Sequence, residues 1–322
     1  MMNMLQKKMG EEMMYHGIIA VWKEAGMTSH DVVFRLRQIL GMRKIGHTGT
    51  LDPQVEGVLV ICLGEGTKLV EYLMDGTKEY DGEITLGYAT ETEDNEGAIV
   101  NQEPVKVPVT TKRIDEAMKQ MEGQIKQIPP YYSAVKVKGK RLYEYARQGL
   151  EVERPQRIVS ISSFTRTSEP IFDSTNHLQR WSFNVVCGKG TYVRTLAVDL
   201  GKNLGYPAHM SKLTRLATGG FTQEDAYTLE EIAQHVDEGT VKSVIHPIES
   251  GLKEFKRIDL SSTMYEDVNN GKVLPLNYFG FNLDEKVALF YEDHLIAIYD
   301  RHPSKENAIK PDKLFNHYRH IQ

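Results

Sequence analysis

The stretch that most constrains this chain is residues 46–53, which read Gly-His-Thr-Gly-Thr-Leu-Asp-Pro. An apolar run follows at residues 58–63, and a run of this length is typical of a buried strand. The stretch therefore holds its carboxylate, Asp52, beside the core on a rigid support. Glycine lets the backbone approach a ligand closely, and Pro53 fixes the backbone just after the acid. The alternative is an ordinary tight turn in which Asp52 accepts hydrogen bonds from its own backbone.

The composition is that of a soluble globular protein. The 322 residues are 40% hydrophobic and 26% charged, which allows a sizeable core and roughly two domains. No apolar run approaches the roughly 20 residues that cross a bilayer. Residues 1–16 carry charges without the apolar segment of a signal peptide, so we expect a flexible N-terminal tail and a cytoplasmic protein away from membranes. Cys62 and Cys187 lie in apolar runs without metal-ligand spacing, so no structural zinc is expected.

The charges are segregated along the chain although the net charge is only −5. Residues 35–47 carry four Lys or Arg residues and no acid, whereas residues 79–103 carry eight acids and no base. Residues 134–158 and 188–215 are also predominantly basic. A basic face for nucleic acid can therefore exist on an acidic protein. The alternative is that these charges only solvate the surface.

Local patterns predict most helices and strands. Residues 18–22 read as a strand, and Thr28 with Asp31 resembles a capping box that opens a helix. Gly41 then suits the position after the helix end. A linker near residues 246–251 precedes a small β-rich module. The other expected elements are a short helix at 67–74, a strand from 78 with one buried face, a helix at 111–121 ended by Gly123, a strand at 181–187, a helix through Leu200 with Gly201 after it, and a β-hairpin of alternating strands at 287–299.

Two further stretches carry chemistry-bearing residues. Residues 129–132 read Pro-Pro-Tyr-Tyr and run into four cations by residue 141. Aromatic rings beside cations can stack bases and neutralise phosphates, but a proline-rich bend with half-buried tyrosines explains them equally well. Lys189 lies between two glycines before a helix, a place that can bind an anion, although the spacing of a Walker loop is absent. Arg194 near the start of that helix is a surface arginine unless an acid partners it.

Five motifs in one order resemble the family of bacterial tRNA pseudouridine synthase B. The resemblance extends from residue 17 to about residue 230. It implies an α/β (α+β) pseudouridine synthase fold with a mixed, mostly antiparallel sheet flanked by helices and a small C-terminal β-barrel of the PUA type. It also implies a catalytic domain at 17–247, an RNA-clamping insertion at about 125–155, and an RNA-binding module at 248–322. The motifs are residues 46–53, 78–80, 128–130 with 142–149, 188–195, and 208–213.

The same resemblance implies a reaction. The family isomerises uridine 55 in the T loop of tRNA to pseudouridine, without cofactor or metal, and we expect a monomer that needs no protein partner. Asp52 matches the aspartate that forms a covalent adduct, on either the base or the ribose. Tyr80 matches the tyrosine that stacks on the flipped-out uracil and can assist proton transfer. Arg194 matches the arginine that pairs with the aspartate.

The resemblance also implies substrate-binding residues. Tyr192 and Leu213 match residues that line the uridine pocket, and His47 matches the histidine that fills the space left by the flipped base. Lys23 is assigned to the substrate site as well, although Glu24 after it departs from the Lys-Pro pair of many members. Two other functions fit the same residues: a catalytically silent tRNA-binding or folding chaperone, and a hydrolase that uses Asp52 as nucleophile.

Overall fold

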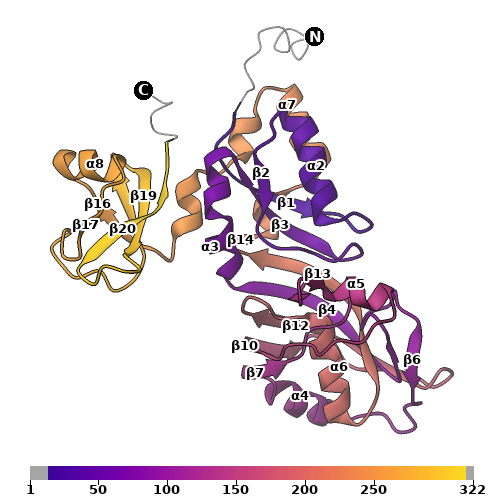
Figure 1. Cartoon of the computed structure of the whole chain (residues 1–322). Coiled ribbons are helices and arrows are strands. Elements are labelled where there is room, and N and C mark those ends of the chain that lie inside the picture. The colour runs from indigo at the N-terminus through magenta and orange to yellow at the C-terminus, as the bar shows by residue number, and fades with distance from the viewer. Residues whose placement is uncertain (1–13, 317–322) are drawn as a thin grey trace.

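The computed structural model describes residues 14–316, and the predicted tail at 1–16 lies almost wholly outside them. Within the described residues, no helix is long and apolar enough to cross a membrane. An eleven-stranded sheet forms the larger part of the molecule, and a smaller five-stranded sheet lies beside one end of it (Figure 1). The main path of the large sheet runs in the order β15 (Ala226–Tyr227), β1 (Gly17–Lys23), β3 (Glu56–Leu63), β13 (Ala208–Thr218), β4 (Lys78–Leu86), β12 (Leu178–Cys187), β10 (Arg157–Arg166) and β7 (Gly123–Gln127). Most of its pairs are antiparallel, but β1–β15 and β3–β13 are parallel, so the predicted mixed sheet is confirmed.

The first lobe contains the Asp52 loop and is built as its local patterns predict. Strand β1 (Gly17–Lys23) pairs along its whole length with β3 (Glu56–Leu63). Helix α2 (Ser29–Leu40) begins with the predicted capping box of Thr28 and Asp31 and ends at Gly41, whose φ is 65°. The two ends of helix α2 were predictable because the groups that form them lie within a few residues of one another.

The second lobe surrounds strand β4 (Lys78–Leu86), which lies between β12 (Leu178–Cys187) and β13 (Ala208–Thr218). Helices α4 (Thr111–Lys119) and α6 (Val193–Leu204) cover one face of this half of the sheet (Figure 1). Trp181 and Phe183 of β12 lie in the hydrophobic core that these helices form with the sheet. This packing holds β4 and β13 in place in the second lobe.

Two glycines predicted to end helices do something else. Helix α4 (Thr111–Lys119) ends before Gly123, which has φ of 90° and opens β7 (Gly123–Gln127). Helix α6 (Val193–Leu204) continues through Gly201 and is capped by Gly205 in the left-handed conformation. A Cβ at Gly201 would lie 2.4 Å from the Cβ of Ala208. The glycine is therefore required by close helix–strand packing, which local sequence does not reveal.

The C-terminal module is a curled five-stranded half-barrel, in keeping with the predicted PUA-like module. The predicted hairpin is present as β18 (Val287–Tyr291) and β19 (His294–Arg301), with positive φ at both residues between the strands. The expected alternation along these strands is wrong, because both faces are buried. Leu289 packs inside the module, whereas Phe290 faces a hydrophobic cluster shared with strands β1 and β3 of the large sheet.

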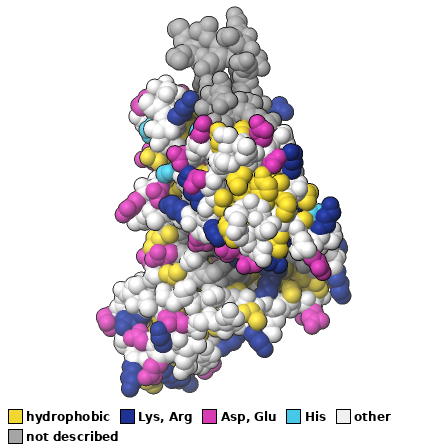
Figure 2. All heavy atoms as spheres, turned by 90° about the vertical axis from the view of Figure 1, so that its left-hand side faces the viewer, with side chains coloured by type: hydrophobic (Ala, Val, Ile, Leu, Met, Phe, Trp, Pro, Cys, Tyr) yellow, Lys and Arg dark blue, Asp and Glu magenta, His cyan; other side chains and the backbone are white. Residues whose placement is uncertain are grey.

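Charges on the outer face of the module are mixed. Figure 2 looks onto this side of the molecule and shows acidic and basic side chains interspersed around hydrophobic ones. This view therefore shows no continuous basic surface.

The remaining elements are β2 (Ile45–His47), η1 (Gly64–Leu69), α3 (Val70–Asp75), β5 (Tyr88–Thr90), β6 (Ile99–Gln102), β8 (Lys136–Val137), β9 (Lys140–Arg141), α5 (Leu142–Arg147), β10 (Arg157–Arg166), β11 (Ile171–Asp173), β14 (Phe221–Thr222), η2 (Gln223–Asp225), β15 (Ala226–Tyr227), α7 (Leu229–Asp237), η3 (Val241–Val244), η4 (Ile248–Leu252), β16 (Lys256–Asp259), α8 (Ser262–Asn269), β17 (Leu274–Pro275) and β20 (Ala308–Leu314).

Candidate active site

Asp52 lies in the connection between β2 and β3, and several backbone hydrogen bonds hold that connection. The N–H of Thr48 donates to the carbonyl of Val60 at 3.0 Å, and the N–H of Val55 donates to the carbonyl of Asp52 at 3.0 Å. From helix α2, Ser29 Oγ accepts from the N–H of Leu51 at 2.9 Å. The loop is thus fastened to the sheet and to a helix, so the carboxylate has a fixed position.

Arg194 faces Asp52 from the first turn of helix α6. Its Nε lies 2.9 Å from Asp52 Oδ2, and its side chain is only 5% exposed, whereas 41% of the Asp52 side chain is exposed. The guanidinium also donates to the carbonyls of Thr92 at 2.7 Å and Tyr132 at 2.9 Å. Asp94 Oδ2 lies 3.9 Å from the same Nε. These contacts orient the cation toward a carboxylate that is partly exposed to solvent.

The electrostatics of Asp52 are balanced between burial and charge. Burial of the loop raises the pKa of Asp52, the nearby Arg194 opposes this rise, and Asp94 adds to it. A carboxylate shielded from water but partnered by a cation stays available in its ionised form. Such a group can act as a nucleophile or a base on a ligand that reaches its exposed side.

Tyr80, on strand β4, lies on the sheet between the Asp52 loop and helix α6. It is 7% exposed, and burial raises the pKa of its hydroxyl, while Arg215 opposes the rise. Leu213 lies on the neighbouring strand and pairs with Gly82, two residues along from Tyr80. Tyr192 precedes helix α6, and Gln127 bonds both its N–H and its carbonyl at 2.8 and 3.0 Å. The three residues predicted to surround uracil therefore come from adjacent elements.

The other two predicted binding residues have different environments. Lys23 is fully buried, and its ammonium donates to the carbonyls of Glu24, Met27 and Pro53 at 2.7–3.0 Å. Burial lowers the pKa of Lys23 to about 8. One of the three bonds reaches Pro53, so Lys23 fastens the turn at residues 24–27 to the backbone beside Asp52. His47 is half-buried at the loop entrance, and burial lowers its pKa, which favours the neutral imidazole.

Three contributors to the site were not singled out by the sequence. Asp94 and the Thr92 carbonyl come from the acidic turn between β5 and β6, which reads only as a polar loop. Arg215 appears in the sequence as one charge of a basic segment, yet the structure buries it beside Tyr80. At the predicted anion site, the ammonium of Lys189 forms a surface ion pair with the carboxylate of Asp75. No sequence signal marks these pairings, because each joins distant segments.

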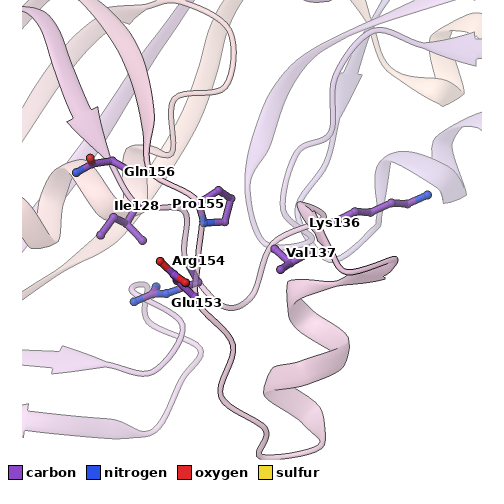
Figure 3. Close-up of a pocket in the computed structure, with 7 residues that line it drawn as sticks. All are labelled: Ile128, Lys136, Val137, Glu153, Arg154, Pro155 and Gln156. Atoms are coloured by element: carbon purple, nitrogen blue, oxygen red, sulfur yellow. The ribbon is translucent and has the colours of Figure 1, made fainter.

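The predicted insertion lies next to this site. Tyr131 is half-buried, with the Arg154 guanidinium 4.3 Å from the centre of its ring, whereas the cations at 136–141 are exposed. The half-buried Tyr131 agrees with the proline-rich bend, whereas RNA binding by the exposed cations stays a prediction. A hollow of about 750 Å³ lies at the base of the insertion (Figure 3). It is lined by Ile128, Lys136, Val137 and residues 153–156, and Asp52 is not part of its wall.

Comparison with known proteins identifies the family. The sequence matches the TruB family pseudouridylate synthase N-terminal domain over residues 37–193 and the tRNA pseudouridylate synthase B C-terminal domain over residues 194–253. The chain belongs to the TruB family of pseudouridylate synthases. It is 49% identical over 306 residues to tRNA pseudouridine synthase B of Bacillus pumilus strain SAFR-032, covering 94% of this chain and 98% of that protein.

Other relatives agree with this assignment. The tRNA pseudouridine synthase B of Streptococcus pneumoniae serotype 4 is 50% identical over 301 residues, covering 94% of this chain and 100% of that protein. Among solved structures, a chain of a Cbf5-Nop10-Gar1 complex superposes with a TM-score of 0.71 at 26% identity, over 93% of this chain and 84% of that chain. The predicted TruB-family membership and fold are therefore confirmed over nearly the whole chain.

Proposed function

We infer that this chain is an isomerase that converts a uridine of tRNA to pseudouridine, the activity named for its full-length relatives. We propose that the target is uridine 55 of the T loop and that Asp52 is the nucleophile. The contact between Asp52 and Arg194 carries this proposal, because it joins the two motifs on which the chemistry depends at 2.9 Å. A silent RNA-binding protein would have no need for this buried, oriented cation beside a carboxylate.

The neighbouring groups supply the steps that precede bond making. A base inside a folded RNA must first be flipped out, which costs about a few kcal/mol. Stacking on an aromatic ring returns about 1–3 kcal/mol, and Tyr80 offers such a ring beside the carboxylate. His47 at the loop entrance fills the space that the base leaves. Leu213 and Tyr192 close the pocket around uracil, and Lys23 acts through the Asp52 loop.

We also propose how the chain is organised around this reaction. The catalytic domain spans 17–247, the insertion at about 125–155 clamps the RNA, and residues 248–322 form the RNA-binding module. The exposed cations at 136–141 support the clamp, and the hydrogen bonds between Ile18 and His246 support a domain end near 247. The proposed protein is a cytoplasmic monomer that needs no protein partner, metal or cofactor.

The decisive experiment replaces the proposed nucleophile. Asp52→Asn should abolish pseudouridine formation in a T-arm RNA and leave RNA affinity within a few-fold, because one carboxylate is lost and the basic surface is unchanged. Asp199→Asn is the matched control, since Asp199 lies on helix α6 and pairs with Lys202. Chemical mapping of pseudouridine after single-turnover incubation gives the readout. Appreciable turnover by the Asn variant would remove Asp52 from this role, and binding without turnover by the unaltered chain would favour the silent alternative.

A further inference from the structure

Arg215 is a buried cation without an acidic partner among the residues that the structure describes. Its side chain is 1% exposed. Its Nε donates to the carbonyl of Val58 at 2.7 Å, and its Nη2 lies 3.5 Å from the carbonyl of Gly49. Burying a charge without an opposite charge is costly. A position that retains one at the centre of the sheet therefore requires a reason other than stability.

The fold brings this cation to the two proposed catalytic segments. On strand β13, Arg215 pairs with Gly57 of β3 on one side and with Tyr80 of β4 on the other. A Cβ at Gly57 would lie 2.3 Å from the carbonyl oxygen of Arg215, so glycine is needed for this close approach. The register of β13 against β4 shifts between Arg215 and Ala217. Such irregularities re-aim side chains next to active sites.

The surroundings of Arg215 leave Tyr80 as the group that can best use its charge. The guanidinium charge and a side-chain hydrogen bond from Arg215 both favour the ionised form of the Tyr80 hydroxyl, against its burial. Cys187 and Asp52 act in the opposite direction and raise the pKa of Tyr80 together with its burial. The pKa of Lys23 and of Lys78 is lowered to about 8, mainly by burial and in part by Arg215. His47 is shifted in the same direction, mainly by burial.

We propose that Arg215 is a positioning residue that holds the Tyr80 hydroxyl in place and activates it as the proton acceptor of the isomerisation. This inference rests on the proposed function. Once ribose is joined to carbon five of uracil, the hydrogen on that carbon must leave as a proton. The Tyr80 oxygen takes that proton, and the electron pair of the broken C–H bond restores the ring double bond. Nitrogen one gains a proton from solvent, and Tyr80 returns its own to solvent, so the isomerisation is balanced.

The contact of Arg215 with Gly49 also links the Asp52 loop to Tyr80. Gly49 belongs to the loop that holds Asp52, and Tyr80 belongs to strand β4, so a single guanidinium spans both. The cation thereby fixes the spacing between nucleophile and proton acceptor. A residue with only a structural role would hold the loop but would leave the proton chemistry of Tyr80 unaffected.

The test measures single-turnover rates on a T-arm RNA from about pH 7 to pH 10. Arg215→Gln keeps N–H donors for the two carbonyls but removes the charge, and Arg215→Lys keeps the charge. We expect the rising limb of the Gln variant to move to higher pH by at least one unit. The limb of the Lys variant should move in the same direction by less, because its ammonium keeps the charge but forms fewer hydrogen bonds. Lys212→Met, which removes an exposed cation from the same strand, is the matched control and should leave the limb in place.

A double variant separates activation from simple support. In Tyr80→Phe the hydroxyl is absent, so adding Arg215→Gln should change the pH profile no further. A loss of rate by one factor at every pH, or an equal loss in the Tyr80→Phe background, would overturn the proposal. Pseudouridine formation by the unaltered chain is the separate check on the proposed function, because its absence would refute that function and say nothing of Arg215.

A direct titration keeps the proposal testable if the Gln variant does not fold. With tyrosine labelled by ¹³C at Cζ, the Tyr80 resonance is identified by its loss in Tyr80→Phe. The titration midpoint of Tyr80 should be lower in the unaltered chain than in Arg215→Lys, because the smaller head group of lysine forms fewer hydrogen bonds. Equal midpoints in the two folded proteins would overturn the proposed activation.

Discussion

Removing the cation beside Asp52 should shift the pH dependence of the reaction in a direction that the structure fixes. In Arg194→Gln, the carboxylate loses the opposite charge whose Nε lies 2.9 Å away. Two unit charges about 4 Å apart attract by roughly 1 kcal/mol in water and roughly 4 kcal/mol near a protein surface. Because 41% of the Asp52 side chain is exposed, the lower half of this range applies. About 1–2.5 kcal/mol corresponds to a rise of roughly one to two pKa units.

The sign follows from which form of Asp52 reacts. The proposed nucleophile must be ionised, and loss of Arg194 raises the pKa of Asp52 beyond the rise that burial already causes. Activity should therefore be lost first at low pH and partly recovered as the pH rises. Below both pKa values, the ionised fraction falls about tenfold per unit, so the variant should be slower there by a further 10- to 100-fold.

Single-turnover rates from pH 5 to pH 8 at saturating enzyme make the assay, with RNA affinity measured at each pH. Arg194 also orients the Thr92 and Tyr132 carbonyls, so a constant loss at every pH is expected in addition. The diagnostic is the displacement of the acidic limb. Arg113→Gln is the matched control, because Arg113 also donates to a backbone carbonyl but lies away from Asp52. A limb at the same pH in both variants would refute the electrostatic role of Arg194.

Three further predictions concern the base, the RNA and the fold. Tyr80→Leu should turn over about 5- to 150-fold more slowly than Tyr80→Phe, since it also loses stacking of about 1–3 kcal/mol; equal rates would exclude the stacking role. Replacing Lys138, Lys140 and Arg141 by Ala should weaken RNA binding and flatten the plot of log affinity against log salt by roughly two units, whereas an unchanged slope would make them a solvated face. Burial opposes ionisation of Glu65, but hydrogen bonds from two lysines lower its pKa to about 2. Its stabilising effect is therefore present above about pH 4.5 and lost as the pH falls through about 2. Glu65→Gln should lower the free energy of unfolding by about 1–2 kcal/mol at pH 7, after allowing for the exposed lysines, and by nothing below about pH 2 in denaturant titrations.

The sequence predicted those parts of the site that lie in short motifs. Asp52, Tyr80 and Arg194 each belong to a compact pattern, and the structure places Asp52 and Arg194 in contact. Arg215 was missed as an individual because its surroundings depend on the register of β13 against two strands more than 130 residues away along the chain. Asp94 was missed for a similar reason, since nothing in a polar turn indicates which cation it faces.

The fold shows the same division between local and distant causes. The capping box of helix α2 was predictable because Thr28 and Asp31 bond each other. The true end of helix α6 was not, because Gly201 is required by Ala208 across a helix–strand contact. Alternation along the C-terminal strands predicts one exposed face, which is wrong because the second face is covered by residues far away along the chain.

That second covered face determines how the two parts of the molecule move. Ala288, Phe290 and Ile298 of the module share one hydrophobic cluster with Val58 and Leu73 of the catalytic domain. Domains joined by such an apolar contact do not swing freely as tethered ones do. The module is therefore held in a fixed position relative to the large sheet. An RNA that binds both parts, as we propose, has to match the spacing that this contact sets.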